Sequence, residues 1–146
     1  MIETSPTLGV VERVLFLREV PIFRRLEPED LERIGALAGE RIYHQSEFLC
    51  REGDPGEELF VLVEGSVEVG KQAEGAARIL RTLTTGDHLG ELAILRKQPR
   101  SASVRASSSV RALVLGSEAL RSILTERPEV CLAMLESMAE RMSTLG

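Results

Sequence analysis

The stretch GELAILRKQPRSAS, residues 90–103, contains the residues whose types and order best fit ligand chemistry. A short helix starting after Gly90 would leave backbone N–H groups unpaired at its positive end, where an anion can bind. Pro99 ends that helix and turns the chain, which brings Arg100 back toward the same end. The planar guanidinium can hold two anionic oxygens, and Glu91 can accept hydrogen bonds from neutral hydroxyls. This order predicts a ligand with one compact anion beside a hydroxyl, such as a sugar phosphate.

Each of these residues also has an ordinary structural explanation. An arginine after a proline is commonly a solvated surface residue, and an acid at the start of a helix commonly interacts with the helix dipole. The ligand prediction therefore depends on the joint order of Gly90, Glu91, Pro99 and Arg100, and on none of them alone.

The longer segment LGELAILRKQPRSASVRA resembles the phosphate-binding cassette of cyclic nucleotide-binding domains. The usual pattern reads FGE, leucine or isoleucine, AL, an aliphatic residue, three variable residues and then PRxA, and it aligns without a gap. Leu89 stands where an aromatic residue is usual and Ile94 where leucine is usual, and both keep apolar character. Upstream, EFLCREGDPGEELFVLVEGSVEV is similar to the strand, glycine turn, strand and glycine hairpin of the family. The resemblance covers about residues 18–145.

The resemblance implies roles for individual residues. Arg100 and Ser101 would hold the cyclic phosphate together with backbone amides near Ala93 and Ala102. Glu91 would accept a hydrogen bond from the ribose 2′-hydroxyl, and Gly90 would let the wall of the pocket approach the ligand closely. The ligand-binding set is thus predicted as Gly90, Glu91, Leu92, Ala93, Arg100, Ser101 and Ala102. The favoured ligand is cAMP, and cGMP remains an alternative because Ser101 can bond the phosphate of either nucleotide. The implied fold is an eight-stranded jelly-roll-like β-roll, mainly β, with flanking α-helices.

The elements that must position these residues follow from the hydrophobic pattern. Apolar residues recur at helical spacing in TLGVVERVLFLREV and EPEDLERIGALAG. From Arg41 onward, short apolar or alternating runs are separated by glycine-rich turns, which indicates an antiparallel β unit. We expect a single domain over residues 1–146, with N-terminal helices at about 7–39, a β-roll at about 40–116 and C-terminal helices at about 117–145.

The last predicted helix has an apolar stripe at spacings of three or four residues. Its members are Val130, Met134, Met138, Met142 and Leu145. All aromatic residues lie in the first 60 positions, so none is close in sequence to the cassette to stack on a purine. Met138, Met142 and Leu145 are therefore the candidates for a lid over the base. The alternative is that the stripe is core or the seam of a homodimer.

Composition and charge exclude several function classes. With 18 basic and 23 acidic residues the net charge is -5, so neither nucleic acid nor an anionic membrane is an expected partner. No apolar run approaches the length of a membrane span, and the N-terminus lacks the features of a secretory signal, so we expect a cytoplasmic protein. Cys50 and Cys131 are expected to be reduced structural thiols.

No catalytic arrangement is evident in the sequence. The histidines, His44 and His88, are far apart, and no Ser/His/Asp, Cys/His or metal-ligand pattern includes them. His88 beside Asp87 is interpreted as a turn pair. The chain is predicted to be no enzyme and to need no metal or cofactor. We expect a sensor module that binds a cyclic nucleotide and repositions its C-terminal helices to signal to a partner protein or fused domain; the alternative is a degenerate fold that serves as a protein-interaction domain without nucleotide.

Overall fold

The computed structural model describes residues 7–73 and 75–145, apart from the side chains of Ala73, Leu92, Ala93 and 141–145. The chain forms two compact units. One comprises Gly39–Ser117, and the other comprises Thr7–Ala38 together with the chain from Glu118 onward.

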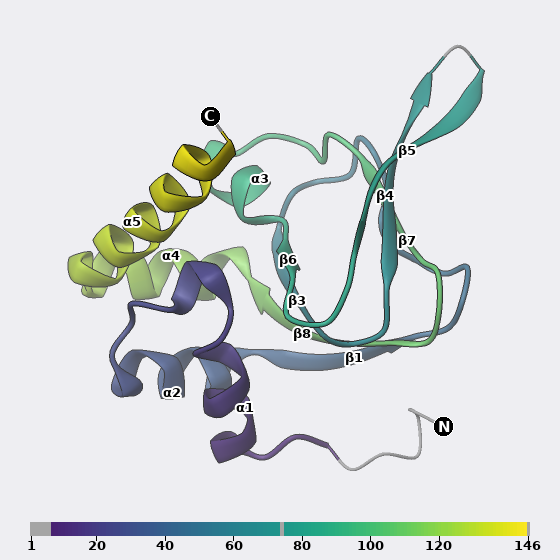
Figure 1. The fold of residues 1–146 in the computed structure, drawn as a ribbon. Coiled ribbons are helices and arrows are strands. Elements are labelled where there is room, and N and C mark those ends of the chain that lie inside the picture. Colours follow the sequence, from purple (N-terminus) through teal and green to yellow (C-terminus); the bar gives the residue numbers. More distant parts are fainter. Residues whose placement is uncertain (1–6, 74, 146) are drawn as a thin grey trace. The chain divides into compact units, whose positions relative to one another are not determined.

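The first unit is a β-roll made of two four-stranded antiparallel sheets (Figure 1). The strand order is β1-β8-β3-β6 in one sheet and β2-β7-β4-β5 in the other. The eight strands found in the described residues confirm the eight-stranded jelly-roll-like β-roll with flanking helices that the sequence predicts. They are β1 (Gly39–Tyr43), β2 (Phe48–Cys50), β3 (Glu58–Glu64), β4 (Val67–Ala73), β5 (Ala76–Leu83), β6 (His88–Leu89), β7 (Ser103–Ala106) and β8 (Val110–Gly116).

The inner faces of the two sheets share one hydrophobic core. Successive side chains of a strand point to opposite faces, so Phe60 and Leu62 of β3 and Val67 and Val69 of β4 all point inward. Each fully buried aliphatic or aromatic side chain contributes about 1.5–3 kcal/mol relative to exposure, so the core holds the strands in this register. The remaining core residues are Leu49, Leu89, Val104, Ala106, Val110, Ala112 and Val114.

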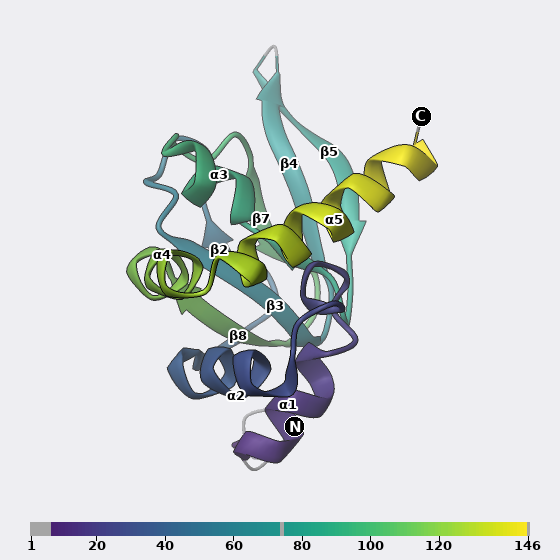
Figure 2. The same cartoon turned by 90° about the vertical axis from the view of Figure 1, so that its left-hand side faces the viewer.

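Helix α3 (Glu91–Arg96) interrupts the succession of strands between β6 and β7 (Figure 2). It starts directly after Gly90 and ends before Pro99, as the proline and glycine predict. Leu89 and Ile94, which depart from the usual cassette pattern, are both buried. This short helix therefore lies within the segment that the sequence predicts to bind the ligand.

The second unit contains four α-helices and a 3-10 helix within the described residues. These are α1 (Val10–Leu17), η2 (Pro21–Phe23), α2 (Pro28–Leu37), α4 (Ser117–Glu126) and α5 (Pro128–Leu145). The Arg13 guanidinium ties α1 to the end of α2 by donating to the backbone oxygens of Gly35 (2.7 Å) and Ala38 (2.6 Å). None of the helices in the described residues combines the length and hydrophobicity that a membrane span requires.

The apolar stripe of α5 is only partly described. Val130 and Met134 are buried, and Met138 is half-buried. Met142 and Leu145 belong to the helix, but their side chains lie outside the described part. Burial of the first two residues fits a packing role for that half of the stripe, and the lid assignment of Met138, Met142 and Leu145 stays a prediction.

Candidate functional site

A pocket of about 120 Å³ opens in the β-roll beside the start of α3. Five of the seven predicted ligand-binding residues lie together in its wall: Gly90, Glu91, Arg100, Ser101 and Ala102. The other two, Leu92 and Ala93, belong to α3, and their side chains are outside the described part. Residues from other strands complete the wall, namely Cys50, Val69, Arg81, Leu89 and Val104.

Arg100 supplies a buried positive charge to this pocket. Its exposed fraction is 7%, and its Nη2 donates to the backbone oxygen of Glu58 at 2.5 Å. Its Nε is buried without a hydrogen-bond partner, and none of the described carboxylates forms an ion pair with it. The guanidinium carbon lies 5.6 Å from the ring centroid of Phe60, which adds a cation–π contact. A buried charge without a counterion is costly, so an anion in the pocket would be strongly favoured.

Gly90 leaves the space that Arg100 occupies. Its φ of 104° lies in the region that favours glycine. A Cβ at this position would overlap the carbonyl oxygen of Glu58 and would lie 2.6 Å from Nη1 of Arg100. The sequence predicts that Gly90 forms part of the wall of the ligand pocket. The geometry adds that the absence of a side chain at Gly90 leaves room for the guanidinium of Arg100.

Glu91 faces His88, which is a contact that the sequence analysis missed. Nε2 of His88 lies 3.4 Å from Oε1 of Glu91, and both side chains are largely buried. Asp87 forms the expected turn, since its carboxylate accepts from the backbone N–H of Thr84 at 2.8 Å. The interpretation of His88 as part of that turn pair is wrong, because His88 begins β6 and is buried. No spacing rule reveals the contact, since a strand ends and a helix begins between the two residues.

Arg81 reaches the pocket because of an irregularity in β5. Val69 pairs with Arg81 and Gly70 pairs with Ile79, so Leu80 is an extra residue in this ladder. In a regular strand Ile79 and Arg81 would lie on the same face. Here Arg81 lines the pocket, whereas Ile79 faces outward. The sequence offers no signal for this bulge, and Arg81 was therefore not predicted.

Cys50 places a thiol in the same wall. It is half-buried, as is Cys131 in α5, and both are free cysteines, which agrees with the expectation of reduced thiols. Burial is the main cause that raises the pKa of the Cys50 thiol above its usual value, so the thiol is neutral near pH 7. Among the described residues, no group of three His, Cys, Asp or Glu side chains is arranged to hold a metal ion.

Comparison with known proteins places this pocket in context. The model of the family described as "Cyclic nucleotide-binding domain" matches residues 40–127. A cAMP-dependent protein kinase regulatory subunit from Emericella nidulans is 34% identical over 109 residues, which are 75% of this chain and 26% of that protein. The chain therefore spans about a quarter of the length of that relative.

Two solved structures share the fold. The N-terminal domain of a transcriptional regulator from Streptomyces coelicolor A3(2) superposes with a TM-score of 0.79 at 32% identity, covering 90% of this chain and 94% of that one. The regulatory domain of Toxoplasma gondii PKA, crystallised with cAMP, gives a TM-score of 0.76 at 30% identity, covering 82% of this chain and 46% of that one.

Proposed function

We propose that this chain, which belongs to the cyclic nucleotide-binding domain family, is a regulatory sensor. It would bind a cyclic nucleotide, with cAMP favoured over cGMP. The observation that carries the proposal is the buried Arg100, whose guanidinium lines a pocket without a carboxylate partner among the described residues. The similar domain of Toxoplasma gondii PKA that was crystallised with cAMP supports this nucleotide.

The phosphate and the ribose of a cyclic nucleotide would each have a matching partner in the pocket. The cyclic phosphate would take the charge of Arg100 and the hydroxyl of Ser101, and backbone amides near Ala93 and Ala102 would add neutral donors. The ribose 2′-hydroxyl would donate to Glu91, which His88 orients from the side at 3.4 Å. At about 120 Å³ the pocket is smaller than the 300–1,000 Å³ of typical ligand sites, so the base would extend beyond it.

Signal output would come from the C-terminal helices. Burying the apolar surface of the base would contribute about 25 cal/mol per Å² to the free energy of binding. Met138, Met142 and Leu145 of α5 are the candidates to cover the base. Ligand would then reposition α5, provided that it binds the closed arrangement more tightly. The receiver would be a partner protein, a fused domain or a second copy through α5, whose Leu132 and Leu135 are 60% and 53% exposed. The chain would act by this movement without catalysis, in the cytoplasm.

Calorimetry and thermal unfolding with cAMP, cGMP and AMP test the proposal. A ligand at a hundredfold excess over its Kd stabilises the native state by about 2.7 kcal/mol, which raises the Tm of a domain of this size by about 5–10 °C. AMP has an open phosphate with an additional charge and should shift the Tm far less. Equal shifts for AMP and cAMP would contradict recognition of a cyclic phosphate. The absence of heat and of any shift at millimolar nucleotide would favour the alternative, a protein-interaction domain that binds no nucleotide.

A further inference from the structure

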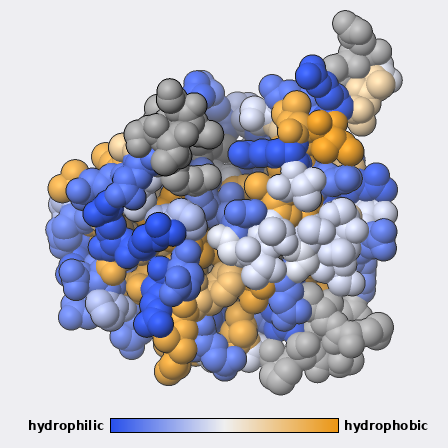
Figure 3. All heavy atoms as spheres, viewed as in Figure 1, coloured by the Kyte–Doolittle hydropathy of each residue, from blue (hydrophilic) through white to orange (hydrophobic). Residues whose placement is uncertain are grey.

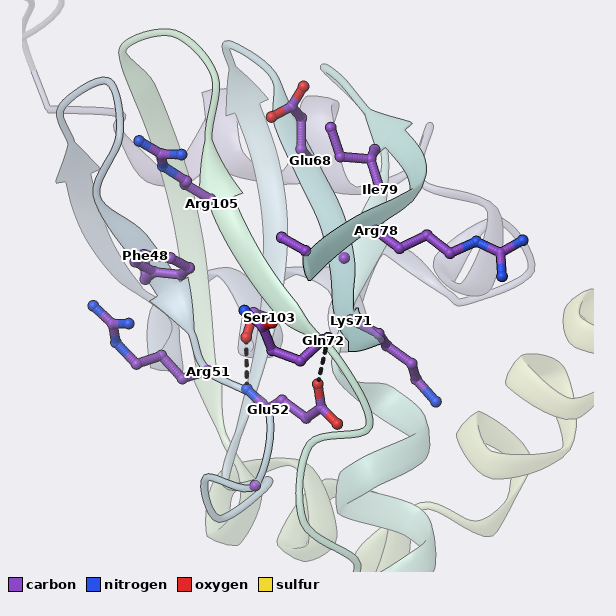
Figure 4. A pocket seen from close by; sticks show the side chains of 13 residues that line it. Phe48, Arg51, Glu52, Glu68, Lys71, Gln72, Arg78, Ile79, Ser103 and Arg105 are labelled. Carbon is purple, nitrogen blue, oxygen red and sulfur yellow. Dashed lines mark hydrogen bonds between the residues drawn. The ribbon is translucent and has the colours of Figure 1, made fainter. Parts of the chain in front are cut away.

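Two features of the β-roll lie outside the predicted set of ligand-binding residues: a surface hollow and the buried side chain of His88. Hydrophobic atoms gather at the base of the β4–β5 hairpin (Figure 3), and a hollow of about 710 Å³ lies on the outer face of the sheet β2-β7-β4-β5 (Figure 4). In this hollow Glu68 lies opposite Arg105 in the sheet, and Glu52 follows Arg51 in the chain. Its charges therefore select neither an acidic nor a basic occupant, whereas His88 contacts a side chain that the proposed ligand would bind.

Backbone hydrogen bonds hold His88 in place. β6 pairs with β3, and His88 lies opposite Val61 in that ladder. The preceding residue, Asp87, accepts at its backbone oxygen from the N–H of Leu62 at 2.9 Å. The side chain of His88 is only 2% exposed, and a buried imidazole is costly unless it is hydrogen-bonded. The sheet, and not the cassette, therefore fixes the position of this imidazole.

The turn at Gly90 brings Glu91 next to the imidazole of His88. Gly90 has a φ of 104°, and its backbone oxygen accepts from the N–H of Ile94 at 3.3 Å, so α3 starts at Glu91. The side chain of Glu91 is 15% exposed, and its Oε1 lies 3.4 Å from Nε2 of His88. One partner in this contact is thus carried by a strand and the other by the first turn of a helix.

The chemistry of the two groups determines how they interact. An ionised carboxylate can only accept hydrogen bonds, so Nε2 of His88 must carry a proton to face Oε1 of Glu91. The separation is longer than an ideal hydrogen bond, but attraction between an N–H group and a carboxylate stays strong in a buried site. The last torsion of a glutamate side chain has no sharp rotamer preference. The N–H of His88 therefore sets the plane of the carboxylate and the direction in which Glu91 accepts.

We propose that His88 is a positioning residue, which orients Glu91 toward the ribose 2′-hydroxyl and so sets the preference for ribose over 2′-deoxyribose nucleotides. The assignment rests on the proposed function, in which Glu91 accepts a hydrogen bond from that hydroxyl. Glu91 lines the pocket around Arg100, whereas His88 is not part of its wall. His88 therefore acts on the ligand through Glu91.

Calorimetry with cAMP and 2′-deoxy-cAMP tests this assignment on the full chain. The parent should bind cAMP at least about tenfold more tightly, because a hydrogen bond from a hydroxyl to a carboxylate is charge-assisted. His88→Phe keeps a ring but removes the donor, and it should reduce this ratio of affinities at least about threefold. His88→Gln supplies an amide donor and should keep the ratio within about twofold of the parent. His44→Gln replaces an exposed histidine outside the pocket and should leave both affinities unchanged.

The double variant H88F/E91Q shows whether His88 acts through Glu91. Once Glu91 is replaced, His88→Phe should change the ratio no further. An equal loss in both backgrounds would overturn the assignment. So would an equal weakening of both nucleotides by folded His88→Phe, because that result is expected of a merely structural residue. Unfolding curves report whether each variant folds.

Nitrogen-15 NMR of the imidazole tests the contact without any ligand or variant. We expect a proton on Nε2 of His88 near pH 7, and a bare Nε2 would overturn the assignment even if His88→Phe does not fold. The outcome for the parent separates the two proposals. If it binds neither nucleotide, the proposed function fails and the role of His88 falls with it. If it binds both equally, nucleotide binding stands and only the role of His88 fails.

Discussion

Substituting Gly90 by alanine should damage both the stability of the fold and the binding of nucleotide. Holding an L-residue at a φ of 104° costs about 1–2 kcal/mol. The added Cβ would also overlap the backbone oxygen of Glu58 and lie 2.6 Å from Nη1 of Arg100, and crowding of this kind costs about a further 1–3 kcal/mol. We therefore expect Gly90→Ala to lower the free energy of unfolding by about 2–5 kcal/mol.

Gly86→Ala is the matched control for backbone strain. Gly86 has a φ of 90°, and a Cβ placed there meets no atom within 4 Å. It should cost only the strain of about 1–2 kcal/mol and should leave the affinity for cAMP unchanged. The difference between the two variants isolates the crowding around Arg100.

Urea unfolding and calorimetry with cAMP measure the two effects separately. Because the guanidinium of Arg100 must move to admit the new methyl group, Gly90→Ala should weaken cAMP at least about tenfold, or about 1.4 kcal/mol. Equal unfolding free energies for Gly90→Ala and Gly86→Ala would refute the packing argument. Unchanged affinity in a folded Gly90→Ala protein would refute the role of Arg100 in the site.

Four further predictions concern the same pocket. Arg100→Ala should weaken the binding of cAMP, measured by calorimetry, by about 2–4 kcal/mol without unfolding the protein. Arg100→Lys should recover only part of this loss, because a lysine ammonium cannot bind two phosphate oxygens at once as the planar guanidinium does. Glu91→Gln should weaken the binding of cAMP less than Arg100→Ala does. It should also reduce the difference in affinity between ribose and 2′-deoxyribose ligands. Iodoacetamide should modify Cys50 slowly near pH 7 and faster as pH rises, since burial raises the pKa of its thiol, and cAMP should protect it while leaving Cys131 unaffected. Deleting the residues after Glu136 should weaken cAMP by about 1–2 kcal/mol, and amide exchange in α5 should slow on binding; unchanged affinity and exchange would mean that α5 is no lid.

The fold could be predicted where local rules apply. Glycine turns separate β3 from β4, and alternation in Val67 and Val69 marks the buried face of β4. Pro99 ends α3 as expected. Strand register could not be predicted, because it depends on pairs far apart in sequence, such as Val69 with Val104. The bulge at Leu80 is the clearest case, since it reverses the faces of all later residues in β5.

The candidate site also has one part that could be predicted from the sequence and one part that could not. The residues of the cassette are contiguous, so the order of Gly90, Glu91 and Arg100 predicted their meeting in one pocket. Arg81 comes from a strand whose register the sequence leaves open, and it was missed.

The loop between β2 and β3 fixes the backbone of the cassette from outside it. The N–H of Gly53 donates to the backbone oxygen of Arg100 at 2.9 Å, and the N–H of Arg100 donates to the backbone oxygen of Asp54 at 2.8 Å. Glu52 donates its N–H to Oγ of Ser103 at 2.8 Å. The position of Arg100 therefore depends on Gly53 and Asp54, which precede it by 47 and 46 positions in the sequence, and no pattern within the cassette could predict that dependence.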